Sequence, residues 1–322
     1  MPSITPSQLV RMARCEVAGR TFGLDMAAIV GIQPSEVVRY ASTATDEVIG
    51  SITSQGRQFP VYSLARLLGL STSGARTGHC IVATDGVDVW GLLTDRVSHS
   101  ESRTAREVVP LPALITGSAG SMIRGVLCGT GEQTLPLIVL DLERLRPASG
   151  MTQAAEPAPS QHSPVVSDVA SSFQSTHRHL MTFLPASAPV GSHLRYAFSV
   201  TQVVEIARIP ESISLLGSPA FVAGLSVWHN QPLPLVHLSA SDTGTAPVPS
   251  PSDRIAIVRV PECQLPLGLL VSGACELLTC PVPGRRVSAA SIGVPESRAR
   301  AVFQLEQQTL LFPRFHLGSI TL

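Results

Sequence analysis

Short apolar runs separated by turn residues make up most of this chain. Residues 80–83 and 87–93 are apolar runs on either side of Asp85-Gly86. Asp-Gly tolerates the positive φ angles of a type I′ turn, so the pattern predicts a β-hairpin. A short helix is predicted at 64–68, ended by Gly69. Many short strands, spaced roughly ten residues apart, indicate a mainly β fold of barrels or sandwiches.

The hydrophobic pattern occurs twice. Residues 22–32 match residues 196–206 at an offset of 174 positions, and apolar residues coincide at five places. At the same offset, residues 59–64 match residues 233–238. A constant offset over this distance indicates a tandem duplication, and two copies are too few for a solenoid. Each copy is therefore predicted to be a complete domain.

A segment of unusual composition separates the copies. Residues 149–178 consist mainly of Ala, Pro, Ser, Gln and Val, with almost no charge. Such a segment cannot supply a core face, so it is predicted to be a flexible linker. The predicted domains are therefore residues 1–148 for the first copy and 179–322 for the divergent second copy.

Charge and composition exclude several classes of function. The 322 residues carry 23 Lys+Arg and 23 Asp+Glu, so the formal net charge at pH 7 is zero. A neutral protein is not expected to be attracted to nucleic acid or to an anionic membrane. All the basic residues are Arg, so no Lys can serve a phosphate-binding loop or a Schiff base. Aromatic residues are only 4%, which predicts an aliphatic core.

The cysteines and the N-terminal residues give information on the cellular compartment of the protein. None of the six Cys forms a C-x-x-C pair, which gives little support to structural zinc or thioredoxin-like chemistry. Cys15, Cys80 and Cys128 lie in apolar runs and are predicted to be small buried hydrophobes. No signal peptide and no membrane-length apolar run is visible, so a cytoplasmic location without membrane insertion is predicted.

Catalytic patterns are weak throughout. Asp85 and Asp88 flank a turn, where Asp is favoured by turn chemistry. His177 and His179 lack a third metal ligand, and Ser226 lies in a sequence one Gly short of a nucleophile elbow. We therefore predict no catalytic residue, no cofactor and no metal, and a protein that is not an enzyme.

Five blocks of the first copy follow one another in a familiar order. They lie at residues 22–32, 48–50, 56–64, 91–97 and 138–145. Together they resemble the CheW-like domain, which is found in chemotaxis coupling proteins and in the regulatory domain of the CheA histidine kinase. The resemblance extends over roughly residues 16–146. The second copy, roughly 179–317, matches the first three blocks well and the end poorly.

The resemblance carries expectations of fold and function. It implies two five-stranded, SH3-like barrels with short helices in each copy, packed over a shared apolar core. It also implies a non-enzymatic adaptor of a chemotaxis-type signalling array. Its partners would be the regulatory domain of a CheA-type histidine kinase and the tips of methyl-accepting receptors, with other CheW-like proteins as further candidates.

Two kinds of position recur in both copies at the offset of 174. Gly50 and Gly224 are predicted to serve a close backbone approach or a bend. Gly56 lies where a turn needs a positive φ, and Asn230 is the usual substitute there, because Asn tolerates this conformation best after Gly.

Turns and strand edges are the expected partner-binding surfaces. Pro60 and Pro234 lie inside apolar strands and lack an N–H, which predicts an edge, a strand start or a bulge. Trp228 is either an exposed anchor at a turn tip or a cover for the end of its own barrel. The predicted partner-binding residues are Gly50, Gln55, Gly56, Arg57, Pro60, Asp95, Glu205, Gly224, Trp228, His229 and Pro234.

Neither copy keeps the full family pattern. The Arg of the family's turn is Gln55 in the first copy and His229 in the second. The acidic residue that the family carries ahead of Ile32 is Gly31 in the first copy and survives as Glu205 in the second, and Asp95 has no counterpart in the second copy, which has Ser272. These departures leave a second hypothesis open, a competitor or regulator in a pilus-motility or other two-component pathway.

Overall fold

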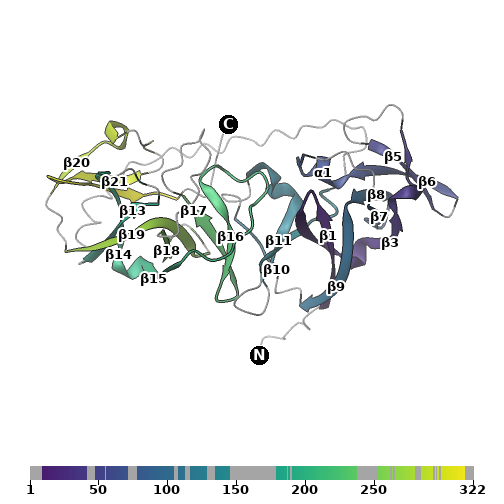
Figure 1. Cartoon of the computed structure of the whole chain (residues 1–322), viewed down its shortest axis with the longest axis horizontal. Coiled ribbons are helices and arrows are strands. Elements are labelled where there is room, and N and C mark those ends of the chain that lie inside the picture. The colour runs from purple at the N-terminus through teal and green to yellow at the C-terminus, as the bar shows by residue number, and fades with distance from the viewer. Residues whose placement is uncertain are drawn as a thin grey trace.

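The computed structural model describes most of both copies (Figure 1). The described residues are 9–41, 48–54, 56–71, 78–104, 108–112, 117–128, 135–145, 179–186, 188, 191–237, 253–261, 263, 265–279, 284–292, 294, 296 and 299–315. The predicted linker at 149–178 lies outside them, as does Gln55.

The first copy contains two sheets of six strands each. The first sheet has the order β10-β11-β12-β2-β1-β9. Its strands are β1 (Leu9–Val17), β2 (Arg20–Asp25), β9 (Arg96–Thr104), β10 (Val108–Val109), β11 (Ile123–Leu127) and β12 (Leu137–Leu140). The second sheet has the order β3-β7-β8-β6-β5-β4. Its strands are β3 (Ile29–Pro34), β4 (Arg39–Tyr40), β5 (Val48–Ser54), β6 (Arg57–Ser63), β7 (His79–Thr84) and β8 (Val89–Thr94).

The second copy repeats these strands in one continuous sheet. Its main path runs β15-β18-β19-β13-β14-β22-β21-β20, and β17 joins β16 to β19. The strands are β13 (His179–Pro185), β14 (Leu194–Ser199), β15 (Val203–Arg208), β16 (Val222–Trp228), β17 (Gln231–Val236), β18 (Arg254–Val258), β19 (Leu267–Thr279), β20 (Arg285–Val287), β21 (Ala299–Gln304) and β22 (Thr309–Pro313).

The helices are short. The α-helix α1 (Leu64–Leu67) begins after Ser63, whose hydroxyl accepts a hydrogen bond from the Arg66 N–H. Gly69 follows with φ +65°, which confirms the predicted helix end. The 3₁₀ turns are η1 (Met26–Ala28), η2 (Ser35–Val37), η4 (Gly117–Met122), η5 (Val200–Gln202) and η6 (Ala289–Ile292).

The duplication is confirmed at the level of strand pairing. In the first copy β12 runs parallel to β2, with Ile138 beside Phe22. In the second copy β22 runs parallel to β14, with Leu311 beside Tyr196. The sequence of β22 departs from the family pattern. It nevertheless forms the strand equivalent to β12, because its apolar side chains are buried as those of β12 are.

The mainly β fold in two repeated halves is confirmed, and each sheet of the first copy has five longer strands with the two-residue strand β4 or β10 added. One expectation of local structure needs correction. The Asp85–Gly86 hairpin exists, but its loop is longer than a two-residue type I′ turn, since only Gly86 has a positive φ and the Asp85 carboxylate accepts from the N–H groups of Val87 and Asp88.

The core is aliphatic, as the composition predicted. Cys15 and Cys80 are fully buried and Cys128 is nearly so, which confirms them as small hydrophobes in the core. Trp90 is also buried, with 2% of its surface exposed. In the first copy one cluster fills the space between the two sheets and unites side chains from β1, β2, β7, β8, β11 and β12.

The two copies share part of this core. Leu215, Leu216, Val222 and Leu225 of the second copy are buried in the same cluster as the first copy's inter-sheet core. In Figure 1, β16 correspondingly lies next to β11. The two copies therefore pack against each other through the segment around β16, a point that the sequence left undecided.

Candidate partner-docking surface

Each copy has an edge strand that exposes apolar side chains. β3 ends the second sheet of the first copy, and β15 ends the sheet of the second copy. Val30 and Ile32 on β3 are 61% and 42% exposed, and Val204 and Ile206 on β15 are 44% and 40% exposed. These pairs are equivalent in the duplication, because each lies 174 positions from its counterpart.

The exposure follows from the geometry of an edge strand. Val30 and Val204 each lie at a register shift of the ladder, between Ile29 and Gly31 in the first copy and between Val203 and Glu205 in the second, and the side chain of a bulged residue departs from the regular alternation of a strand. Among the described strands, β3 pairs only with β7 and β15 pairs only with β18, so no described strand lies along the other side of either one. Proteins usually avoid exposed apolar edges because such edges recruit other chains. Two equivalent apolar edges therefore indicate docking surfaces.

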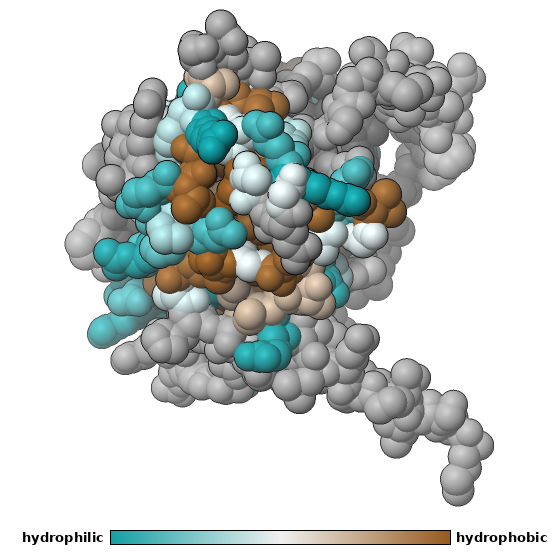
Figure 2. Space-filling view, turned by 90° about the vertical axis from the view of Figure 1, so that its right-hand side faces the viewer, coloured by the Kyte–Doolittle hydropathy of each residue, from teal (hydrophilic) through white to brown (hydrophobic). Residues whose placement is uncertain are grey.

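Exposed apolar side chains are also visible in the space-filling view of the surface. Figure 2 shows the end of the first copy that carries the second sheet, with hydrophobic side chains lying among polar ones. Apolar side chains rimmed by polar ones are typical of protein interaction sites.

The hairpin turns have the backbone that the sequence predicted. Gly56, in the β5–β6 turn, is exposed with φ +74°. Asn230, its equivalent in the β16–β17 turn, has φ +60°, which confirms Asn as the substitute for Gly. His229 is also exposed with φ +47°, a feature that the sequence analysis did not predict. Arg57, directly after the first turn, is exposed at the start of β6.

Trp228 joins its hairpin to the edge strand. Its Nε1–H donates to Oε2 of Glu205 on β15 over 3.0 Å. The indole is half-buried against the core beneath β17 and β18, and the His229 ring meets it edge-on with centroids 4.4 Å apart. Trp228 therefore covers the end of its own domain, which is the second of the two alternatives, and it holds Glu205 beside Val204 and Ile206.

The two prolines share a place in the strands but differ in exposure. Pro60 and Pro234 each come one residue before a parallel pairing begins, at Val61 and at Leu235. Pro60 is exposed, whereas Pro234 is buried. A partner can reach Pro60 directly, and Pro234 acts on the surface only through the strand that it shapes.

Gly50 and Gly224 are buried and bring two strands close together. A Cβ at Gly50 would lie 2.5 Å from the carbonyl oxygen of Arg39, and one at Gly224 would lie 2.9 Å from that of Ile213. Each glycine also follows a register shift in its hairpin. They serve the close backbone approach that the sequence analysis gave as their structural role.

Asp95 stabilises a turn of its own copy. Its carboxylate accepts a hydrogen bond from the Ala18 N–H over 2.6 Å, and its N–H donates to Glu16. This contact marks the break between β8 and β9. In the second copy β19 runs straight through the equivalent position, and the hydroxyl of Ser272 is buried without a hydrogen-bond partner in the described part of the chain. Asp95 is exposed, so a partner can still reach it.

Six of the predicted residues lie in two groups, one in each copy. Glu205, Trp228 and His229 gather at the edge of the second copy, and Gly56, Arg57 and Pro60 follow one another along the hairpin of the first. Sequence reasoning missed Val30 and Val204 as surface residues. The signal was present as an apolar side chain at equivalent places in both copies, but the strand period alone does not say which face is covered.

The described residues show no other arrangement of chemical groups that suggests a site. Among them, no three His, Cys, Asp or Glu side chains gather where they could share a metal ion. Burial raises the pKa of the Cys15 thiol to about 12 and that of Cys80 to about 11, so both stay protonated at neutral pH. Within the same ranges, no helix has the length and apolar character needed to cross a membrane.

Comparison with known proteins finds one family and one similar structure of note. A family model described as the CheW-like domain matches residues 11–148 and residues 188–313. The crystal structure of the scaffolding protein TtCheW from Thermoanaerobacter tengcongensis is 17% identical, with a TM-score of 0.39. That similarity covers 45% of this chain and 92% of TtCheW. No curated protein sequence matches the chain.

Proposed function

Because the chain belongs to the CheW-like domain family, with one match in each copy, we propose that it is a cytoplasmic, non-enzymatic adaptor of a chemotaxis-type signalling array. In this role it couples the regulatory domain of a CheA-type histidine kinase to the tips of methyl-accepting receptors. The coupling is made by protein–protein contacts alone and needs no cofactor.

The observation that carries the proposal is the repeated apolar edge. Val30 and Ile32 on β3 and their equivalents Val204 and Ile206 on β15 are exposed in both copies. An edge of this kind can pair with an added strand or receive apolar side chains of a partner. Glu205 lies between Val204 and Ile206 on β15, whereas the equivalent residue between Val30 and Ile32 on β3 is Gly31, so the two edges differ in charge and therefore in preference.

Two docking domains on one chain suit a coupling role. Once one copy is bound, the partner of the other copy meets a surface held nearby, so its binding becomes effectively intramolecular. The packing of the copies through the segment around β16 limits their relative motion and favours one geometry of the assembly. Such a chain can hold two partners in a defined arrangement.

The test is binding of the full-length chain to its partners. The purified protein is incubated with the cognate kinase regulatory domain and with a receptor-tip fragment, separately and together, at low salt and tens of micromolar. We expect both fragments to be retained, and the two together to be retained more tightly than either alone. Retention of neither fragment overturns the adaptor role.

A second function is favoured by one observation. The family's turn Arg is replaced by Gln55 in the first copy and by His229 in the second, and His229 is exposed at the tip of its turn. A protein with weakened contacts of this kind is suited to act as a competitor or regulator in a pilus-motility or other two-component pathway. If Gln55→Arg and His229→Arg sharply increase kinase coupling, the competitor role is supported instead.

A further inference from the structure

One face of the β16–β17 hairpin forms the contact of the second copy with the first. Leu225 on β16 lies opposite Pro234 on β17, and Ile213 pairs with Leu225 by a bridge. Two residues along the strand, Val227 lies opposite Pro232, so these side chains share one face of the hairpin. Leu225 is buried in the cluster that joins the copies, and Ile213 and Val227 pack against that cluster. We call these residues the joining face.

The same face of the first copy is polar and open to solvent. The positions 174 residues earlier hold Arg39, Ser51, Thr53, Gln58 and Pro60. These residues also share one face, because Ser51 lies opposite both Arg39 and Pro60, and Thr53 lies opposite Gln58. Ser51 is half-buried and the others are exposed, whereas both prolines of the joining face are buried. We call these residues of the first copy the counterpart face.

The contact between the copies joins two different surfaces of the duplicated domain. The second copy supplies its joining face, and the first copy supplies side chains of β2, β11 and β12 among others. β5 and β6, which carry most of the counterpart face, lie at the right-hand end of the molecule in Figure 1, away from β16. A contact between unlike surfaces of like units can repeat from unit to unit, and it then builds rings or open filaments. Each chain therefore keeps one counterpart face and one further receiving surface that this contact does not use.

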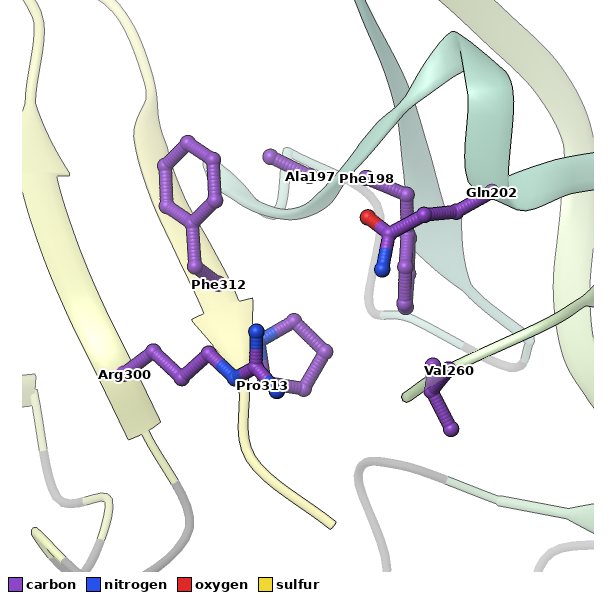
Figure 3. Close-up of a pocket in the computed structure, with 7 residues that line it drawn as sticks. All are labelled: Ala197, Phe198, Gln202, Val260, Arg300, Phe312 and Pro313. Carbon is purple, nitrogen blue, oxygen red and sulfur yellow. The ribbon is translucent and has the colours of Figure 1, made fainter. Parts of the chain in front are cut away.

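The further receiving surface belongs to β14, β21 and β22 of the second copy. These strands are the counterparts of β2, β11 and β12, because the same parallel and antiparallel pairings recur in both copies. Side chains of all three strands line a small pocket, which Figure 3 shows. Phe198 and Pro313 in its wall correspond to Leu24 and Leu140, which belong to the shared cluster in the first copy. The second copy therefore has apolar side chains and a recess at the place that corresponds to the receiving surface of the first.

We propose that the counterpart face confines this contact to a single chain, because its polar residues exclude the receiving surface of a second copy of the chain. Docking would remove water from the exposed Arg39 guanidinium, Thr53 hydroxyl and Gln58 amide. Apolar side chains such as Phe198 and Pro313 offer no hydrogen bonds in exchange, so the cost of removing that water is not recovered. The joining face avoids this cost, since all its side chains are apolar.

The polar residues of the counterpart face therefore determine specificity. Binding of a wrong partner can be prevented by polar groups that would lose their water in the wrong complex. Here the wrong partner is the chain itself, whose two halves carry the two surfaces of a contact that could otherwise repeat without limit. This inference concerns self-assembly, so it goes beyond the adaptor role and does not depend on it.

The test transfers the joining face to the first copy of the full-length protein. One variant carries Arg39→Ile, Ser51→Leu, Thr53→Val and Gln58→Pro, which are the residues of the second copy at these positions. A second variant omits the proline, so the test stays decisive even if proline disturbs the β5–β6 hairpin. Analytical ultracentrifugation measures the mass from low micromolar to hundreds of micromolar. We expect the mass of the variants to rise with concentration beyond that of a dimer, and the wild type to show no such growth.

Two controls separate the specific contact from general adhesion. Arg96→Ile, Ser98→Leu and Thr21→Val together make the same three exchanges as the second variant, at exposed positions of β9 and β2, and this protein should keep the mass of the wild type. Wild-type protein is also mixed in excess with the variants. It offers the receiving surface of its second copy but no new joining face, so it should end each row of chains and reduce the assemblies to pairs of one variant and one wild-type chain.

Three results would overturn the proposal. One is a wild type whose own mass grows with concentration beyond that of a dimer, because the counterpart face would then not prevent self-assembly. Another is the wild-type mass in both variants, which would show that the polar residues do not hold this contact back. The third is growth that the control variant shares or that excess wild type does not reverse, since the assemblies would then not use the joining face.

Discussion

At the scale of single residues, two glycines decide where a short strand can lie. The missing Cβ of Gly50 lets the carbonyl of Arg39 approach, so that β4 joins the sheet of the first copy. Gly224 does the same for the bridge between Ile213 and Leu225 in the second copy. The sequence predicted the close approach from the repeat of these glycines, although it could not say which strand comes close.

Alanine at these glycines should therefore destabilise the protein. A Cβ at residue 50 would lie 2.5 Å from a backbone oxygen and one at residue 224 would lie 2.9 Å away, so the backbone has to move in each case. We expect Gly50→Ala to cost about 1–3 kcal/mol of unfolding free energy in urea, and Gly224→Ala to cost less. Gly31→Ala is the control, because its Cβ meets no atom within 4 Å. Equal effects of all three substitutions would contradict this explanation.

At the scale of strands and hairpins, the order of the blocks was predictable and the position of the edges was not. The apolar runs and the turn residues between them predicted β7 and β8 within a few residues. Whether Val30 and Ile32 face the core or solvent depends on which strand ends the sheet, a property of the tertiary fold. Alternation in β3 fits either case, so the candidate docking edge emerges only with the sheet order.

The hairpin β16–β17 contains a buried His whose charge state should affect stability. His237 directly follows β17, and its side chain is fully buried. Its backbone N–H donates a hydrogen bond to the Phe221 carbonyl over 2.7 Å. Burial lowers the pKa of the imidazole, and the negative charge of Asp253 opposes this effect in part. Phe221 in turn packs against the core that the two copies share, so this His lies beneath the contact between them.

Acid should therefore weaken the second copy. The folded state holds the His237 proton less tightly than the unfolded state does, since the unfolded pKa is the ordinary 6.5. The stability contributed by the neutral ring is complete above that pKa and declines as pH falls below it. Urea unfolding at pH 7.5 and at pH 5.5 should show a smaller loss of stability for His237→Gln than for the wild type. An equal or larger loss in the variant would refute this account.

At the scale of the whole molecule, the two copies have diverged where they meet. Ile213 and Leu225 of the second copy are the equivalents of Arg39 and Ser51 in the first. Arg39 is exposed and Ser51 is half-buried, whereas Ile213 packs against the cluster that joins the copies and Leu225 is buried in it. The apolar residues at these positions therefore occur in the copy whose surface is covered by the other copy. This difference explains how two copies of one domain can present different surfaces at equivalent positions.

Returning one of these positions to the residue of the first copy should loosen the contact. Leu216 is 5% exposed in the shared cluster, and its equivalent in the first copy is Ser42. Leu216→Ser removes a buried side chain from the contact, at a cost of about 2–5 kcal/mol in unfolding free energy. Small-angle X-ray scattering should then give a larger radius of gyration than that of the wild type. Val37→Ser, at an exposed position of the first copy, is the control. An unchanged radius together with unchanged stability would show that the copies do not depend on this cluster.

The central claim is that the two apolar edges bind the signalling partners, and calorimetric titration of edge variants tests it most directly. The full-length chain is titrated with the kinase regulatory domain and with the receptor tip, as wild type and as Ile32→Asp, Ile206→Asp and the double variant. Leu277→Asp serves as the matched control, because Leu277 is 62% exposed but lies on β19 and on neither of the two edge strands. A charge placed in an apolar interface should weaken binding at least about tenfold for the partner of the altered copy, and the double variant should lose both partners. Wild-type affinity for both partners in the double variant, with the control unchanged, would contradict the claim.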